Sequence, residues 1–436
     1  MQTLGKTLSG LFVALLLMGA ASSPKSDWSQ VRLERIDTLL EAAVETNLMI
    51  GGQGLIWQGD QIVYNKTFGK RDHRDAEMLG KDAIYRIYSM TKPITSVGIM
   101  ILAERGELRL NDPLALHLPE FANLRAFDPT AELNADQPLP TQPLERLPTI
   151  EDLLAHKAGF TYGIFGKTPV DLAYLKAGMM MNKQLTLADF TQRLATVPLQ
   201  YQPDTKWHYS VATDVLGRVI EVVSGQSLAE FLETEIFQPL GMRDTRFTIA
   251  KGSEDRVVTL YAPQGTPEQL DPDAFAKAMQ GQGLVPAPDA LNDPYQPDAL
   301  FQSGGGGLLS TTDDYLKFAR MLLNEGELDG VRLLAPSTVR LMRTDFLGEQ
   351  AANAYVNGGT PREGRGFGLG FGMIKDQGLA ATPQGMGTYY WGGAAGTTFW
   401  IDPENDLIGI FMTQSIPHKT QLGQDFMKAT YQAFLR

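Results

Sequence analysis

Residues 88–107, YSMTKPITSVGIMILAERGE, contain the start of a well-specified helix. Ser89 suits a helix start because its hydroxyl can cap free backbone amides, and Pro93 falls in the first turn, where a missing N–H costs little. Lys92 lies one turn after Ser89 on the same face, and helical side chains lean toward the N-terminus. The sequence therefore predicts a serine–lysine pair at the start of an apolar helix.

On either side of this helix, the chain separates into strand-rich ends and a helical middle. Residues 28–47 have the apolar spacing of an amphipathic helix, and residues 51–72 predict a hairpin that turns at Gly59-Asp60. Near the C-terminus, strands are predicted at 388–396, 397–403 and 407–414, and a helix at 421–435. We expect both chain ends to share one antiparallel sheet.

The middle of the chain is predicted to be mostly helical. The expected helices comprise residues 91–104, 150–156, 187–195, 211–223, 228–237 and 312–324. Residues 121–148 and 250–297 are rich in Pro, Asp, Gln and Gly, and we expect surface insertions over the site there. The sequence predicts an α+β fold, in which a helix-flanked sheet domain (24–88 and 300–436) receives a mostly helical domain (89–299), with the site at their interface.

Composition excludes several classes of protein. The chain has 436 residues, of which 43% are hydrophobic and 20% charged, so it can bury a large core. Its formal net charge is -12 and no Lys/Arg cluster interrupts the acidity, which excludes a nucleic-acid partner. It contains no cysteine, which excludes disulfides, thiolate nucleophiles and zinc–thiolate sites.

The N-terminus has the pattern of a secretory signal peptide. Lys6 precedes an apolar run from Leu11 to Met18, and small residues follow through Ser23. The run is shorter than the roughly 20 apolar residues that a membrane-spanning helix needs. The sequence therefore predicts removal of residues 1–21, export to the periplasm or medium, and no permanent membrane span. A buried N-terminal helix is the alternative.

Two further stretches have residues that could complete a site with the serine and lysine. Residues 206–210, KWHYS, form a polar turn ahead of a helix, and Tyr209 could point its phenol into a cleft as a general base. Residues 391–396, WGGAAG, interrupt a strand with glycines, which indicates the close approach of another backbone or a ligand. Taken singly, these stretches also fit a packed tyrosine and a β-bulge.

The order of these three elements resembles the class C β-lactamase and penicillin-binding-protein superfamily. A Ser-x-x-Lys at a helix start, a later Tyr-Ser ahead of a helix and a Gly-rich strand near the C-terminus follow one another in that order. Further stretches resemble its esterase branch, the family VIII carboxylesterases: GELRLNDPLALHLPEF, TIEDLLAHKAGFTYG, PLGMRDTRF, FQSGGGGLLSTTDDYLKFARMLL and WGGAAGTTFWIDP. Together they cover nearly all of the mature chain.

The resemblance implies a role for each matching residue. Ser89 would be the acylated nucleophile and Lys92 its proton partner. Tyr209 would be the general base for attack and later the acid for the leaving group. The amides of Ser89 and Ala394 would form the oxyanion hole. No metal or other cofactor is implied.

The chain departs from the penicillin-interacting members at two motifs. Those members carry Tyr-x-Asn and Lys-Thr/Ser-Gly, where this chain has Tyr209-Ser210-Val211 and Trp391-Gly392-Gly393. The strand lysine of those members helps to hold a substrate carboxylate, whereas a tryptophan offers an apolar wall. We therefore expect Trp391, Gly392 and Gly393 to contact neutral substrate groups, and the resemblance implies hydrolysis of short-chain carboxylic esters.

Several other functions stay open or are disfavoured by the sequence. A β-lactamase or D-amino-acid-specific peptidase of the same fold, or a noncatalytic cell-wall-binding homologue, stays open, as does the oligomeric state. An α/β-hydrolase is disfavoured because the nearest match to G-x-S-x-G is residues 225–229, GQSLA, which follow a helix. A metallohydrolase is disfavoured because the histidines lack metal-ligand spacing. They are His73, His117, His156, His208 and His418.

Overall fold

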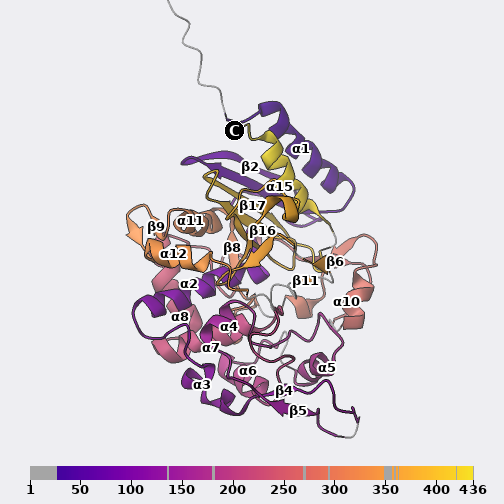
Figure 1. The fold of residues 1–436 in the computed structure, drawn as a ribbon. Coiled ribbons are helices and arrows are strands. Elements are labelled where there is room, and N and C mark those ends of the chain that lie inside the picture. Colours follow the sequence, from indigo (N-terminus) through magenta and orange to yellow (C-terminus); the bar gives the residue numbers. More distant parts are fainter. Residues whose placement is uncertain are drawn as a thin grey trace, which may run out of the picture.

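The computed structural model describes residues 27–435, apart from 135–136, 179–181, 269–271, 293–294, 348–355, 358–359, 362 and 419. The predicted signal peptide, residues 1–21, lies outside the described residues. The described chain forms a sheet covered by two helices at one end of the molecule and a larger group of helices at the other (Figure 1).

A seven-stranded antiparallel sheet joins the two ends of the chain, in the order β13-β14-β15-β16-β17-β1-β2. The strands are β1 (Gly51–Gln58), β2 (Gln61–Gly69), β13 (Arg365–Phe367), β14 (Gly372–Ile374), β15 (Tyr389–Gly392), β16 (Thr398–Asp402) and β17 (Leu407–Thr413). The β1–β2 turn has positive φ at both Gly59 and Asp60, as a two-residue hairpin turn with the right twist requires. The predicted shared sheet and α+β fold are confirmed.

The two terminal helices pack side by side on one face of this sheet (Figure 1). They are α1 (Gln30–Glu45) and α15 (Leu422–Ala433). The Phe426 ring lies so close to β1 that a Cβ on Gly54 would come within 2.8 Å of it. Helix α11 (Thr312–Leu323) contacts β16 and β17. Among all helices of the described chain, none is long and apolar enough to cross a bilayer.

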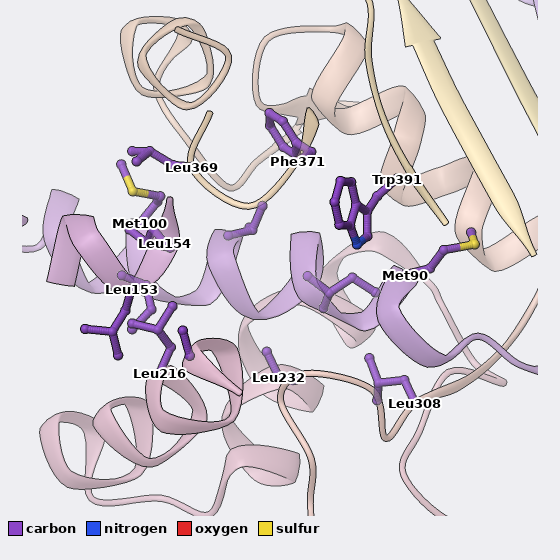
Figure 2. Close-up of a cluster of buried hydrophobic side chains, with 14 of the residues drawn as sticks. Met90, Met100, Leu153, Leu154, Leu216, Leu232, Leu308, Leu369, Phe371 and Trp391 are labelled. Atoms are coloured by element: carbon purple, nitrogen blue, oxygen red, sulfur yellow. The ribbon is translucent and has the colours of Figure 1, made fainter. Parts of the chain in front are cut away.

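Helix α2 (Thr91–Glu104) is enclosed by the helical part of the molecule. Every residue from Thr91 to Leu102 is buried, as expected for a helix that is apolar on nearly all sides. Figure 2 shows its neighbours, which come from α4 (Ile150–Leu154), α7 (Ala212–Ser224), α8 (Leu228–Leu232) and the chain around Leu369 and Phe371. This packing fixes the position of the residues at the start of α2.

The remaining elements are short. The helices are α3 (Leu114–His117), α5 (Pro169–Lys176), α6 (Leu187–Leu194), α9 (Gln238–Leu240), α10 (Pro272–Ala278), α12 (Pro336–Met342) and α14 (Gln377–Ala380). Paired strands are β3 (Ile84–Arg86) with β8 (Leu309–Thr311), β4 (Arg125–Phe127) with β5 (Thr141–Pro143), β6 (Tyr261–Pro263) with β7 (Leu284–Pro286), β9 (Glu327–Leu328) with β10 (Val331–Arg332), and β11 (Val356–Asn357) with β12 (Thr360–Pro361). The expected insertions thus contain short ribbons, and the domain boundaries stay a prediction.

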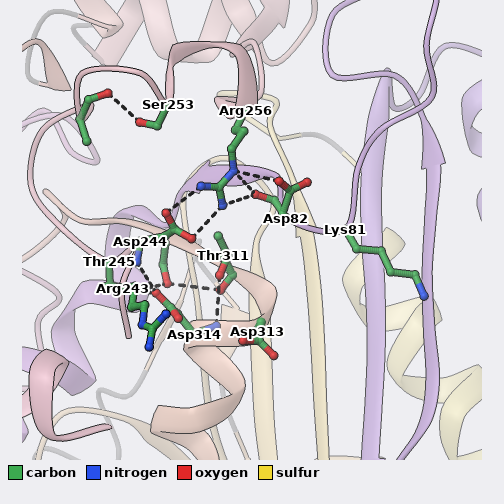
Figure 3. A network of polar contacts seen from close by, with 12 residues as sticks. Lys81, Asp82, Arg243, Asp244, Thr245, Ser253, Arg256, Thr311, Asp313 and Asp314 are labelled. Atoms are coloured by element: carbon green, nitrogen blue, oxygen red, sulfur yellow. Dashed lines mark hydrogen bonds and ion pairs between the residues drawn. The ribbon is translucent and has the colours of Figure 1, made fainter. Parts of the chain in front are cut away.

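The second insertion, residues 250–297, is anchored at its start by the polar contacts in Figure 3. Arg256 donates to both carboxylate oxygens of Asp244, at 2.9 and 2.8 Å, and to the carbonyl of Asp82 at 2.7 Å. Two residues later, the amide of Val258 donates to the carbonyl of Ile84 at 2.9 Å. The insertion is therefore fixed against β3, the strand that leads into Ser89.

Candidate active site

Ser89 lies in a single 3₁₀ turn, Tyr88–Met90, between β3 and α2. The expected capping role of its hydroxyl is wrong, because no side chain caps α2 and the extra turn places Ser89 ahead of the helix. Tyr88 has a φ of 43°, a left-handed conformation that a non-glycine residue adopts at a cost. The turn leaves the Ser89 hydroxyl free to meet other side chains.

The structure brings Ser89, Lys92 and Tyr209 together. The Tyr209 hydroxyl is 2.7 Å from Ser89 Oγ and hydrogen bonds to it. Lys92 is 0% exposed, and its Nζ donates to Tyr162 Oη at 2.7 Å, to the carbonyl of Gly305 at 2.6 Å and to Ser89 Oγ at 3.3 Å. Three acceptors match the three N–H groups of an ammonium. Lys92 Nζ also lies 4.7 Å from the centre of the Tyr209 ring.

A buried carboxylate accompanies the buried amine. Asp214, in the first turn of α7, accepts hydrogen bonds on Oδ1 from Ser303 Oγ at 2.5 Å and from the amide of Gly305 at 3.1 Å. Burial raises the pKa of Asp214, and the positive charge of Lys92 opposes that rise. Asp214 and Lys92 thus both bind the backbone of Gly305. The Asp214 carboxylate accepts from its amide, and the Lys92 amine donates to its carbonyl.

Glycine is required at position 305 for this arrangement. A Cβ there would come within 2.6 Å of Asp214 Oδ2, and a Cβ on Gly304 would come within 2.6 Å of the carbonyl of Thr213. Both contacts are closer than non-bonded atoms tolerate, so the run of glycines allows the loop to touch α7. The loop can therefore connect Asp214 with Lys92.

Sequence reasoning missed Tyr162 and Asp214. Burial raises the pKa of Tyr162 well above its usual value, with a smaller contribution from Tyr209, so its hydroxyl stays protonated. Tyr162 belongs to the stretch TIEDLLAHKAGFTYG, where the flanking glycines were the available signal. Asp214 has the position of an ordinary acidic residue in a first helical turn, where it complements the helix dipole.

The Trp391-Gly392-Gly393 segment lies against the same site. β15 ends at Gly392, and the Gly393 amide donates to the carbonyl of Thr397 at 2.8 Å to close a turn that contains the half-buried Ala394. A Cβ on Gly393 would come within 2.4 Å of the carbonyl of Ile87, two residues before Ser89. The predicted third stretch therefore lies against the chain that leads into Ser89, the predicted nucleophile.

Aromatic rings surround the Tyr209 ring. Their centroids lie at 4.9 Å (His156), 5.2 Å (Tyr162), 5.5 Å (Trp391), 6.1 Å (Trp207) and 6.3 Å (Phe165). Trp391 is buried, with its ring beside α2 (Figure 2), whereas Phe165 is 55% exposed. The phenol is thus held in an apolar aromatic environment that opens to solvent beside Phe165.

Ser227 and His208, two other residues singled out from the sequence, make contacts outside the Ser89 group. Ser227 is the N-cap of α8, where its Oγ accepts from the amide of Glu230 at 3.3 Å and donates to that carboxylate at 2.8 Å, which is a structural capping box. His208 contacts Thr161 Oγ1 at 3.2 Å and the Tyr201 ring. Within the part of the chain that the structure describes, no group of His, Asp or Glu side chains could hold a metal ion.

Several known proteins are similar to this chain over most of its length. Rv1367c of Mycobacterium tuberculosis is 34% identical over 377 residues, covering 86% of this chain and 88% of that protein. Esterase EstB of Burkholderia gladioli is 29% identical over 391 residues, covering 87% and 90%. The solved structure of EstCE1, described as a hydrolase with promiscuous acyltransferase activity, has a TM-score of 0.73 at 26% identity and covers 93% of this chain and 99% of its own.

The sequence profile of the family described as Beta-lactamase matches residues 36–429. That range contains the whole sheet and all three stretches of the site. The chain therefore belongs to the Beta-lactamase family.

Proposed function

We propose that the protein is a serine hydrolase that cleaves short-chain carboxylic esters through an acyl-enzyme on Ser89. The observation that carries this proposal is the position of Ser89 Oγ, 2.7 Å from the Tyr209 hydroxyl and 3.3 Å from Lys92 Nζ. A nucleophile within hydrogen-bonding distance of its base is the usual requirement for such chemistry. The similarity to Esterase EstB and to the hydrolase EstCE1 supports the same reaction class.

In acylation, Ser89 Oγ attacks the ester carbonyl carbon while its proton passes to the oxygen of Tyr209. Tyr209 acts as a phenolate in this step, and the ammonium of Lys92, 4.7 Å from the ring centre, stabilises its negative charge. Tyr209 then gives the proton to the leaving alkoxide, and the alcohol departs. In deacylation, water loses a proton to Tyr209, attacks the acyl carbon, and Ser89 recovers the proton as the acid leaves.

The amides of Ser89 and Ala394 are proposed to bind the carbonyl oxygen. In the described chain, neither amide donates a hydrogen bond to a protein acceptor, so both can donate to a substrate. The close approach of Gly393 to Ile87 supports this pairing, because it brings the Ala394 turn against the chain that enters Ser89. Each such donor lowers the barrier by about 3 kcal/mol in comparable hydrolases.

The surroundings of Tyr209 support a neutral ester as substrate. By the resemblance, Trp391 corresponds to the strand lysine of the penicillin-interacting members. The rings of Tyr162, Phe165 and Trp391 pack around Tyr209. Apolar rings favour uncharged acyl and alcohol groups, and they form no ion pair with the carboxylate of a lactam or peptide. An ester is therefore preferred to a β-lactam or a D-amino-acid peptide.

A substrate panel tests this preference. We expect kcat/KM for p-nitrophenyl butyrate to exceed that for nitrocefin by about 100-fold, as the loss of a charge-assisted contact predicts, with no release of D-alanine from a D-alanyl-D-alanine peptide. Faster opening of nitrocefin would contradict the proposal.

We also propose that the protein is exported after removal of residues 1–21. The intact mass of the enzyme recovered from the periplasm measures whether these residues have been removed.

Replacing Asp214 with asparagine is expected to lower kcat about ten- to hundredfold, because a buried charge that faces the Lys92 ammonium is lost while the side-chain shape is kept. The measurement is kcat and KM for p-nitrophenyl butyrate, with the melting temperature as a check of folding. Asp189→Asn is the matched control, since Asp189 also occupies the first turn of a helix, α6, on the protein surface. If Asp214→Asn had the same kcat as wild type, Asp214 would not contribute to catalysis.

A further inference from the structure

Arg86, the last residue of β3, has a buried guanidinium that pairs with no carboxylate among the described residues. The residue is 4% exposed, and its Nη1 donates to the carbonyl of Val258 at 2.9 Å. Its Nε is buried without a hydrogen-bond partner. The groups near enough to influence its charge are Tyr88 and Tyr295, and burial lowers the pKa of Arg86. Nothing in the hydrolytic steps described above uses this residue.

A buried cation without a counter-ion is expensive to keep. Arg256, in the same region, shows the ordinary arrangement, because it is partly exposed and pairs with Asp244 and Asp82 (Figure 3). Within the part of the chain that the structure describes, the Arg86 guanidinium binds the Val258 carbonyl and lies over the Tyr295 ring, whose centre is 5.3 Å from Cζ. A cation over an aromatic face is stabilised without being neutralised. The positive charge of Arg86 therefore remains available to act on its surroundings.

The backbone of Arg86 lies close to that of Ser89, whose amide belongs to the proposed oxyanion hole. Three residues of extended chain span at most about 11 Å, so the α-carbons of Arg86 and Ser89 lie within that distance. Tyr88 lies edge-on to Tyr295 with ring centres 5.9 Å apart. Both belong to a buried apolar cluster that includes Ala395 and against which Ala394 packs. The buried side chain of Gln414 lies beside this cluster and binds both the amide and the carbonyl of Arg86. In a mostly apolar medium a charge acts over a longer distance than in water.

Tyr295 also connects the cation with the lysine of the site. Its hydroxyl donates to the carbonyl of Gly306 at 3.1 Å, and the preceding residue, Gly305, accepts the hydrogen bond from Lys92. The second insertion thus supplies the ring beneath Arg86 and an anchor for the glycine loop. Because Val258 and Tyr295 both come from residues 250–297, this insertion holds the Arg86 guanidinium in position and shields it from water.

We propose that Arg86 is a further positioning residue of the hydrolytic reaction, whose buried charge stabilises the oxyanion of the tetrahedral intermediate. When Ser89 Oγ bonds to the carbonyl carbon, the carbonyl electron pair moves to the oxygen, which becomes negative between the Ser89 and Ala394 amides. Arg86 neither gives nor takes a proton and does not touch the substrate. Its field favours the state in which the oxygen is negative over the state in which it is neutral. The inference rests on the proposed function.

The test separates this electrostatic role from a purely structural one. Arg86→Met removes the charge and keeps an unbranched apolar side chain, Arg86→Lys keeps a charge, and Arg86→Gln keeps a donor for the Val258 carbonyl without the charge. Arg320→Met is the matched control, because the Arg320 guanidinium also lies over an aromatic ring, 5.4 Å from the centre of Trp57, but on α11. Each variant is assayed for kcat and KM with p-nitrophenyl butyrate, for the rate of inactivation by a p-nitrophenyl alkylphosphonate, and for melting temperature.

We expect Arg86→Met and Arg86→Gln to lower kcat about tenfold or more and to slow phosphonylation by the same factor, since both reactions place negative charge in the oxyanion hole. KM should stay within about twofold of wild type, because the neutral ester gains little from the charge. The melting temperature of Arg86→Met should not fall by more than about 3 °C, since removal of an unpaired buried charge offsets the lost hydrogen bond. Arg86→Lys should recover most of kcat, and Arg320→Met should match wild type.

Wild-type kcat in a folded Arg86→Met or Arg86→Gln protein would overturn the inference. The inference would also be overturned if Arg86→Met and Arg86→Lys lost kcat equally and both had lower melting temperatures. That result would show that Arg86 has a purely structural role. If Arg86→Met does not fold, Arg86→Gln decides alone. The proposed function fails separately, when Ser89→Ala hydrolyses the ester as fast as wild type. A Ser89-dependent enzyme whose Arg86 variants are unaffected leaves the proposed function intact.

Discussion

Replacing Ser89 with alanine is expected to reduce ester hydrolysis by about 10⁴-fold or more, because no acyl-enzyme can form without the hydroxyl. The fold should be unaffected, since the hydroxyl caps no helix and its contacts are those to Tyr209 and Lys92. The measurement is kcat/KM for p-nitrophenyl butyrate together with the melting temperature, which we expect to stay within about 2 °C of wild type.

Covalent labelling gives this prediction an independent control. One phosphonate should add to the wild-type enzyme on the peptide that contains Ser89, and none should add to Ser89→Ala. Ser227→Ala should label as wild type does, because Ser227 forms a capping box at the start of α8. Hydrolysis that survives in Ser89→Ala, or a label on Ser227, would show that another residue is the nucleophile.

Replacing Tyr209 with phenylalanine is expected to lower kcat by about 10²- to 10⁴-fold, the usual contribution of a general base. Phenylalanine keeps the ring that packs against Trp391, Tyr162 and His156, and it loses only the oxygen that lies 2.7 Å from Ser89 Oγ. KM should change little, because the apolar surroundings of the site are kept. Steady-state kinetics with p-nitrophenyl butyrate measures both constants.

Tyr201→Phe is the matched control for this substitution. Tyr201 is part of the same loop, and its ring packs edge-on against His208 with centroids 5.1 Å apart. Its kcat should equal that of wild type. If Tyr209→Phe also retained wild-type kcat, the phenol would not be the base, and the amine of Lys92 would be the group that takes the proton from Ser89.

Sequence could predict the elements whose signals are local. Helix α2 has the predicted bounds, because Pro93 favours a helical first turn and a long apolar run follows it. The hairpin turns at Gly59-Asp60, where both residues tolerate positive φ. The serine–lysine spacing follows from helical geometry in the same way. None of these signals depends on distant parts of the chain.

The convergence of the three stretches could not be derived from spacing. The contact between Ser89 and Tyr209 joins residues 120 positions apart, and tertiary packing alone decides such a contact. The resemblance to a known superfamily supplied that information. It did not point to Asp214, Tyr162 or Arg86, because the importance of each comes from burial beside a partner that is remote in sequence.

The prediction that the Ser89 hydroxyl caps α2 is wrong for a local physical reason. A serine ahead of an apolar helix usually caps it, but here the preceding Tyr88 has a left-handed backbone and starts a 3₁₀ turn before α2 begins. Tyrosine is not among the residues that favour this conformation, so the sequence has no signal for it. The surrounding packing imposes the turn, with the Tyr88 ring held against Tyr295.

The pairing of β1 with β17 joins a strand from the start of the chain to one from its end. The nucleophile is encoded in the first quarter of the message, whereas β15 and the turn behind it are translated near the end, and β17 later still. Ser89 is therefore synthesised well before the Ala394 turn, which is proposed to complete the oxyanion hole. If Ser89 and Ala394 act as proposed, a chain that still lacks its C-terminal strands has no complete site, and hydrolysis requires the finished chain.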